Sequence, residues 1–296
     1  MPRLLIDSLN EAIHRSTGKT CRVVHLTATG GGSISRALVA EAENAKWFVK
    51  INSIELLDMF KAEIDGLNAL SKCREIRVPH VVAAGRADQE AYLVLEYLDI
   101  LPLSDASAAS AGRALAALHR ITGNGFGWSR DNFIGSTPQS NQFHQDWPEF
   151  FARERLLPQL DLARRNGHPG TLIDNGERLS EKLHLFFSGY RTSPSLLHGD
   201  LWHGNTGLDR DGKLVLFDPA VYFGDREADL AMTELFGGFP AAFHATYRDA
   251  WPLAEGYPQR RTLYNLYHVL NHLNLFGSSY RPQAQHMISA LLAEIG

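Results

Sequence analysis

The chain has 296 residues, enough for one large domain or for two lobes that each have a hydrophobic core. With 44% hydrophobic and 21% charged residues its composition is ordinary for a globular protein, and no apolar run approaches the roughly 20 residues of a membrane-spanning helix. The formal net charge of -4 argues against a nucleic-acid-binding protein, because a phosphate backbone calls for a basic surface. We therefore expect no nucleic-acid and no membrane partner.

Cysteine usage and the N-terminal segment indicate the compartment. Cys21 and Cys73 make no disulfide framework and lack CxxC spacing. The first 18 residues place apolar side chains, including Leu5, Leu9 and Ile13, at helical spacing with charges between them. This pattern predicts an amphipathic helix rather than a secretion signal. We expect a cytoplasmic protein, while its oligomeric state stays open.

The predicted elements change in kind along the chain. Short β-rich runs predict strands within four segments, which are 21–28, 36–42, 46–53 and 91–98. A helical pattern over residues 54–71 lies between the last two. From Asp105 onward helical patterns dominate, broken by paired short strands around Leu196 and Leu214. The sequence therefore predicts an α+β fold.

This asymmetry also predicts the domain organisation. A small β-rich N-terminal lobe would span residues 1–98, and a larger, mainly helical C-terminal lobe would span residues 99–296. The joint lies near LEYLDILP, residues 95–102, where the strand patterns end.

Three glycines, Gly30 to Gly32, stand between the first two predicted strands and are followed by Ser33. Glycine permits positive φ and close backbone approach, so such a turn can direct N–H groups at a phosphate. The segment lacks GxxxxGK[ST] and a following helix, which excludes a Walker-type loop. We predict that Gly31, Gly32 and Ser33 bind nucleotide, and the alternative is a simple hairpin turn.

A lysine and a glutamate on the next two elements predict an ion pair. Lys50 lies in the third predicted strand and shares a face with Phe48. On the following helix, Glu63 falls within the same apolar stripe as Leu56 and Leu70. Burying an unpaired carboxylate is costly, so Glu63 requires a cation, and Lys50 is the obvious candidate. The pair is either purely structural or holds Lys50 against nucleotide phosphates.

Two apolar runs in the second half end on polar residues with kinase spacing. LLHGDLWHGN places Asp200 five residues before Asn205, and VLFDPA ends its run at Asp218. In phosphoryl transfer from ATP, one carboxylate orients the attacking hydroxyl while other groups hold magnesium ions. The D-x-x-x-x-N spacing matches a kinase catalytic loop, and Asp218 stands where kinases place the metal-binding aspartate. We predict that Asp200 is the catalytic base and that Asn205 and Asp218 bind Mg²⁺.

An alternative use of this region is a zinc site. His198 and His203 could bind zinc beside Asp200 and Asp218, but no HExxH motif and no Cys/His cluster supports it.

Longer strings identify a family. LLHGDLWHGN, LFDPAVYFGDREADLAM, DWPEFFARERLLPQLDLA and YNLYHVLNHLNLFGSSYR together resemble the fructosamine kinase (ketosamine-3-kinase) family over most of the chain. The resemblance implies a bilobal, protein-kinase-like fold of the aminoglycoside phosphotransferase type. It also implies Mg²⁺- and ATP-dependent phosphorylation of the sugar 3-hydroxyl of ketosamines, the amine adducts of glycation. The 3-phosphate makes the adduct unstable and releases the amine, which is a repair activity.

The resemblance also implies roles for individual residues. The nucleotide-binding pair, the catalytic base and the metal ligands of the family match the residues already predicted. Glu96, Tyr97 and Leu98 match the hinge whose backbone faces adenine.

Substrate residues follow only from the resemblance. Trp202 matches a family tryptophan after the catalytic aspartate, whose ring could stack on the sugar or its amine. Asn271 and His272 match a family helix that borders the substrate cleft. Many members have serine where this chain has His203, a departure that affects the expected substrate preference more than the chemistry.

Two alternative functions remain open at this stage. One is a related kinase that acts on another small hydroxyl compound or an amino sugar. The other is a non-catalytic ATP-binding regulator, although every catalytic position is filled. A protein kinase is disfavoured because the chain lacks an A-P-E string after Asp218. The sequence does not indicate which ketosamine sugar or amine is preferred.

Overall fold

The computed structural model describes residues 2–18, 22–30, 34–105 and 107–296. The chain forms two compact units, each built from two stretches of sequence. Unit 1 comprises Met1–Pro102 and Thr206–Asp218, and unit 2 comprises Leu103–Asn205 and Pro219–Gly296. The division differs from the predicted boundary after residue 98, because a later segment returns to the first unit.

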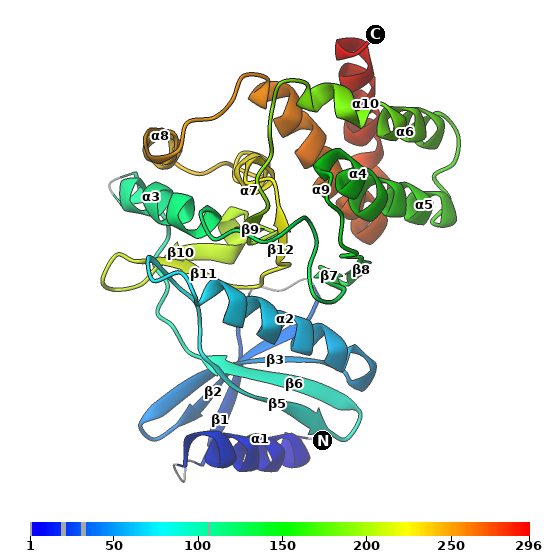
Figure 1. Ribbon diagram of the computed structural model, residues 1–296. Coiled ribbons are helices and arrows are strands. Elements are labelled where there is room, and N and C mark those ends of the chain that lie inside the picture. The colour runs from blue at the N-terminus through cyan, green and yellow to red at the C-terminus, as the bar shows by residue number, and fades with distance from the viewer. Residues whose placement is uncertain (1, 19–21, 31–33, 106) are drawn as a thin grey trace. The chain divides into compact units, whose positions relative to one another are not determined.

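Unit 1 is built on a five-stranded antiparallel sheet (Figure 1). Its strands in chain order are β1 (His25–Ala28), β2 (Arg36–Ala42), β3 (Ala45–Ser53), β5 (Val81–Ala87) and β6 (Glu90–Glu96). The spatial order is β1-β2-β3-β6-β5, so β3 lies at the centre of the sheet. The central position buries β3 more than the edge strand β1.

Two helices cover this sheet on opposite faces (Figure 1). They are α1 (Pro2–Thr17) and α2 (Leu57–Leu70), which follows a 3₁₀ turn at Ile54–Leu56. The predicted amphipathic stripe of Leu5, Leu9 and Ile13 is buried against Val49 and Val94 of the sheet. Burial of this stripe explains why the N-terminal segment forms a helix.

The segment Thr206–Asp218 joins unit 1 through a second, three-stranded sheet. Its strands are β4 (Ile76–Arg77), β10 (Thr206–Leu208) and β11 (Leu214–Leu216). β11 pairs antiparallel with β10 and parallel with β4. A backbone bridge between Leu101 and Leu208 adds a further connection.

Unit 2 is mainly helical (Figure 1). Its helices are α3 (Ala108–His119), α4 (Trp147–Phe151), α5 (Leu157–Arg165), α6 (Thr171–Glu181), α7 (Glu227–Met232), α8 (Ala241–Ala250), α9 (Tyr257–Phe276) and α10 (Arg281–Glu294). A π-helical turn lies at Ala152–Leu156, and 3₁₀ turns lie at Leu183–Phe187, His203–Asn205 and Ser278–Tyr280. Its strands are β7 (Asn132–Ile134), β8 (Thr137–Gln139), β9 (Ser195–Leu197) and β12 (Tyr222–Gly224).

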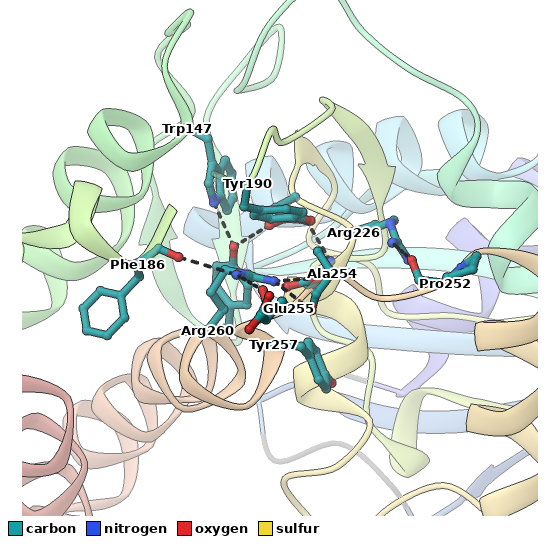
Figure 2. Close-up of polar contacts among 12 residues, drawn as sticks. Trp147, Phe186, Tyr190, Arg226, Pro252, Ala254, Glu255, Tyr257 and Arg260 are labelled. Carbon is teal, nitrogen blue, oxygen red and sulfur yellow. Dashed lines mark hydrogen bonds and ion pairs between the residues drawn. The ribbon is translucent and has the colours of Figure 1, made fainter. Parts of the chain in front are cut away.

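Aromatic packing holds unit 2 together. Trp147 is 1% exposed, and its Nε1 donates a hydrogen bond of 3.0 Å to the hydroxyl of Tyr264 on α9 (Figure 2). Its ring also packs against Phe150 and Tyr222. The start of α4, the helix that carries Trp147, is fixed by a neighbouring residue. The side chain of Asp146 accepts the backbone N–H of Glu149 and caps the helix.

One expectation about strand pairing was wrong. The strands around Leu196 and Leu214 form but do not pair, because β9 pairs with β12 while β11 pairs with β10 and β4. The sequence analysis also missed β5, because its run VVAAGRA lacks strict alternation and lies partly exposed.

Among the described residues, none of the helices combines the length and the apolar composition of a membrane-spanning segment.

Candidate active site

The predicted phosphate-binding turn is largely outside the described residues. Gly31, Gly32 and Ser33 lie there, so their predicted contacts with nucleotide stay predictions. β1 and β2, which precede and follow this segment in the sequence, pair antiparallel.

Lys50 and Glu63 form the ion pair expected from the sequence. Lys50 lies on the central strand β3, opposite Ala37 of β2 and Leu93 of β6. Its Nζ lies 2.7 Å from Oε1 of Glu63 on α2, and both residues are less than 10% exposed. The apolar stripe of α2 therefore carries a carboxylate because a buried ammonium stands opposite it.

Asp218 is a second partner of Lys50, which the sequence analysis did not foresee. Its Oδ1 lies 2.5 Å from Nζ of Lys50, and its side chain is 38% exposed. Asp218 follows β11 and has a φ of 57°, in the left-handed region that an aspartate enters only at some cost. The strand end thus directs this carboxylate at Lys50 within unit 1.

The charges of this trio shift one another. Burial alone would lower the pKa of Lys50, but the carboxylates of Asp218 and Glu63 outweigh it and raise the pKa above its ordinary value. Burial raises the pKa of Glu63 to about 7, with Lys50 opposing this shift and Asp218 adding to it. Lys50 therefore stays cationic, and Asp218 is its more exposed partner.

The predicted hinge follows β6 and is tied to the segment that returns to unit 1. The backbone N–H of Glu96 donates to the carbonyl of His80 at 2.8 Å. Its carboxylate accepts from Arg77 at 2.7 Å, and Arg77 also reaches Asp209 at 3.4 Å. The Glu96 N–H is thus used within unit 1, and the predicted adenine contacts through the backbone of Glu96, Tyr97 and Leu98 stay predictions.

Asp200 and Asn205 lie together in a loop of unit 2 after β9. Nδ2 of Asn205 donates to the backbone oxygen of Asp200 at 2.9 Å and to its Oδ2 at 3.1 Å. Gly199 has a φ of 82°, and a Cβ placed on it would lie 2.1 Å from the carbonyl oxygen of Ala220. Only glycine fits this position, which explains the HGD sequence.

Asp229 of α7 holds the backbone of this loop. Its Oδ2 accepts the N–H of His198 at 2.7 Å, and its Oδ1 accepts the N–H of Gly199 at 2.9 Å. Nε2 of His119 lies 3.2 Å from the same Oδ2 that accepts the N–H of His198. Although burial would raise the pKa of Asp229, hydrogen bonds from His119 and the loop lower it below the ordinary value. Sequence reasoning missed this residue, whose only signal was a carboxylate within the apolar helix EADLAM.

Two of the predicted substrate residues, Trp202 and His272, belong to one aromatic group of unit 2. The group consists of Trp202, His203, Phe236 and His272. Trp202 contacts His203 edge-on at 4.8 Å between ring centroids, and Nδ1 of His203 lies 2.6 Å from the carbonyl oxygen of Phe236. The ring of Phe236 lies 4.6 Å from that of His272. Both His203 and His272 thus contact Phe236.

Asn271 has a different environment. It is 4% exposed, its Oδ1 accepts from Gln159 at 3.2 Å and its Nδ2 donates to the carbonyl of Ile134 at 3.3 Å. Both ends of its amide are therefore used inside unit 2.

Comparison with known proteins identifies the family. The sequence profile described as fructosamine kinase matches residues 5–294. The chain belongs to the fructosamine kinase family. A Synechocystis protein assigned as a ketoamine kinase is 43% identical over 287 residues, which cover 97% of this chain and 96% of that protein. The chloroplastic protein-ribulosamine 3-kinase of Arabidopsis thaliana is 39% identical over 278 residues, 93% of this chain and 85% of that protein.

Solved structures agree with this membership. A Haemophilus somnus protein assigned as a fructosamine-3-kinase has a TM-score of 0.89 at 30% identity, covering 96% of each chain. A variant of aminoglycoside phosphotransferase APH(4)-Ia, solved with AMP-PNP and hygromycin B, has a TM-score of 0.64 at 17% identity over 97% of this chain and 98% of that chain. The predicted family, kinase-type α+β fold and enzyme class are thereby confirmed.

Within this fructosamine kinase family member, the alternative of a zinc centre gains no support. The described residues contain no group of three or more His, Cys, Asp or Glu side chains that could hold a metal ion. His198 is fully buried, with its backbone N–H bound to Asp229. Its position is typical of a residue that packs behind the loop.

Proposed function

We propose that this kinase transfers the γ-phosphoryl group of ATP to the sugar 3-hydroxyl of a ketosamine, with Mg²⁺ as cofactor. The observation that carries the proposal is Lys50 held by Glu63 and Asp218 in a chain whose HGDLWHGN loop pairs Asp200 with Asn205. The ketosamine class and the 3-position rest on relatives described as a ribulosamine 3-kinase and a fructosamine-3-kinase.

Lys50 has the properties required of a phosphate-binding cation. It is buried, charged and fixed on a central strand, and Glu63 restricts the position of its Nζ. When ATP binds, its phosphate oxygens would take over part of the interaction that Asp218 makes with Lys50. Backbone N–H groups of Gly31, Gly32 and Ser33 would add donors to the phosphates, and the backbone of Glu96, Tyr97 and Leu98 would face adenine.

Asp218 and Asn205 each offer an oxygen atom of a type that suits magnesium. Asp218 offers a partly exposed carboxylate, and Asn205 uses its Nδ2 toward Asp200, which leaves its Oδ1 as an oxygen donor. Carboxylate and amide oxygens are the ligands that Mg²⁺ prefers. Held by these oxygens, Mg²⁺ would supply positive charge against the transferred phosphate.

Asp200 acts on the attacking hydroxyl. A carboxylate with an ordinary pKa near 4 cannot fully deprotonate a sugar hydroxyl before reaction. In a loose transition state it need not, because the proton can leave late. In the proposed step, the 3-hydroxyl of the sugar donates a hydrogen bond to Asp200. The hydroxyl oxygen then bonds to the γ-phosphorus as the bond between this phosphorus and ADP breaks, and the hydroxyl proton passes to Asp200. Orientation of the hydroxyl is the larger contribution.

Trp202 and His272 are the proposed contacts on the substrate side. The aromatic group that includes Phe236 presents ring faces and edges, which suit a sugar or a cationic amine. With this substrate class the activity is deglycation, and we place it in the cytoplasm. Asn271 supports the helix rather than the substrate in this proposal, since both ends of its amide are used.

The test is ADP production with Mg²⁺ and ATP against a ribulosamine, a fructosamine, an aminoglycoside, choline and free ribose. Asp200→Asn serves as the control for catalysis. We expect turnover on the ketosamines that is lost in Asp200→Asn. Turnover restricted to another compound would reassign the substrate, and ATP binding without turnover on any compound would favour a regulator.

A further inference from the structure

Unit 2 contains a cavity of about 110 Å³ that the proposed mechanism does not use. It is lined by Tyr190, Arg191, Ser193, Asp225, Arg226 and Trp251. The side chains of Arg191 and Ser193 are exposed, so the cavity opens to the surface, whereas Asp225 and Arg226 are 1% and 6% exposed. Two oppositely charged, buried residues therefore line one small cavity.

Among the described residues, the hydrogen-bond donors to Asp225 are all neutral. Its Oδ1 accepts from the hydroxyl of Tyr190 at 2.9 Å and the N–H of Glu227 at 3.1 Å, and its Oδ2 accepts from the hydroxyl of Tyr264 at 2.6 Å. The nearby cation Arg260 is already paired with Glu227 at 2.7 Å. In the described part of the chain, no basic nitrogen lies within 4.0 Å of the Asp225 carboxylate. Burial and the Glu227 charge raise the pKa of Asp225 to about 6.

Arg226 is likewise without an acidic partner in the part of the chain that the structure describes. Its Nη1 donates to the hydroxyl of Tyr247 and the carbonyl of Trp251, both at 3.2 Å. Its Nη2 donates to the carbonyl of Pro252 at 2.5 Å, a contact drawn in Figure 2. The guanidinium lies 4.3 Å from the centre of the Trp251 ring. The cation is thus solvated by carbonyls, a hydroxyl and aromatic faces.

A single ligand could supply both missing charges. Buried charges are costly unless each is paired and hydrogen-bonded, and a carboxylate has about four acceptor positions, of which three are used on Asp225. A molecule with one ammonium and one carboxylate group would pair with Asp225 and Arg226 at once, and Arg191 at the opening adds positive charge. The cavity corresponds to about four water volumes, which limits the ligand to the size of glycine or alanine.

We propose that this cavity binds a small zwitterionic amino acid, with its ammonium group toward Asp225 and its carboxylate toward Arg226 and Arg191. The inference does not depend on the proposed ketosamine substrate. It has a consequence for the loop, because Asp225 accepts the N–H of Glu227, the first residue of α7, and α7 carries Asp229. A ligand here would stabilise the start of the helix that holds the catalytic loop.

The test is calorimetric titration of the full chain, without ATP or sugar, with glycine, acetate and methylamine. We expect glycine to bind and to raise the melting temperature. Acetate and methylamine, which carry one charge each, should bind at least about tenfold more weakly. Equal affinity for acetate and glycine, or the absence of binding by all three at millimolar concentrations, would overturn the proposal.

Two matched variants locate the binding. Ser193→Leu fills the opening without altering Asp225 or Arg226, and Ser188→Leu changes another exposed serine outside the cavity. Ser193→Leu should weaken glycine binding at least about tenfold and leave kinase turnover in the absence of glycine unchanged. Ser188→Leu should bind glycine like the parent chain. Unchanged glycine affinity in Ser193→Leu would place any binding elsewhere and contradict the proposal.

Discussion

At the scale of single residues, the Nζ of Lys50 has two carboxylate oxygens within 2.7 Å, and the residue is buried on the central strand β3. In Lys50→Met we expect turnover to fall at least about 100-fold, because a preorganised positive charge near the phosphates is lost. Folding should survive, since burial already raises the pKa of Glu63 to about 7 and this group can take up a proton. Steady-state kinetics and circular dichroism measure the two effects.

Lys61→Met is the matched control for this prediction. Lys61 lies on the exposed face of α2 and pairs with Asp58 at 2.8 Å. Such a surface pair contributes little, so turnover should stay at the parental rate. Parental turnover in Lys50→Met would contradict the proposed nucleotide role.

Residue patterns predicted the Lys50–Glu63 pair because a carboxylate inside an apolar stripe requires a cation. They did not predict that Asp218 also pairs with Lys50, since the two residues are 168 positions apart and Asp218 follows a strand of a different sheet. Spacing suggested a chemical type for Asp218, but not its partner. The contact between Lys50 and Asp218 could not be predicted from local residue patterns, because it forms only when distant segments of the chain fold together.

At the scale of elements, Asp229 of α7 holds the backbone of the proposed catalytic loop at His198 and Gly199. In Asp229→Asn one of the two loop N–H groups loses its acceptor, and we expect kcat to fall about 10- to 100-fold. KM for ATP should stay the same, because Lys50 and Glu63 lie in the other unit. A purely structural role would lower the amount of folded protein without this division between kcat and KM.

Asp211→Asn is the control, because Asp211 is exposed in the turn before β11 and its change should alter neither constant. If Asp229→Asn has the parental kcat, the loop does not depend on α7.

The buried His268 on α9 should make the free energy of unfolding depend on pH. Burial lowers the pKa of His268 to about 3, so the folded chain keeps this residue neutral while an unfolded histidine takes up a proton below about 6.5. Stability is therefore lost as the pH falls from about 6.5 toward 3. Between about pH 7 and pH 5 this group alone contributes about 2 kcal/mol, which His268→Gln should remove.

Urea unfolding at the two pH values measures this contribution. The control is His286→Gln, because His286 is exposed and this variant should lose as much unfolding free energy between the two pH values as the parent chain. A His268→Gln chain that loses as much stability as the parent would show that another group causes the acid sensitivity.

Long elements with a regular residue pattern were predictable, whereas the pairing of the shortest strands was not. The strands β2, β3 and β6 and the helix α2 carry seven or more residues of regular pattern, and the sequence located all four. β9 and β11 have three residues each, too few to specify a partner, and their pairing was wrong.

At the scale of the whole molecule, the segment Thr206–Asp218 completes unit 1 from a distant part of the sequence. A fragment of residues 1–102 would lack β10 and β11, so β4 would have no partner strand. It would also lack Asp218, whose carboxylate pairs with Lys50. We expect this fragment to unfold without a cooperative transition, although the sequence marked residues 1–98 as a lobe. A cooperative thermal transition in the fragment, measured by calorimetry, would show that the returning segment is dispensable.

The central claim is that Asp200 directs phosphoryl transfer to the 3-hydroxyl of a ketosamine. The most direct measurement is nuclear magnetic resonance of the product formed from a fructosamine with Mg²⁺ and ATP, by the parent chain and by Asp200→Asn. The account predicts a single phosphate on O3 with the parent and none with the variant. Phosphate on another oxygen, or the same product from Asp200→Asn, would contradict it.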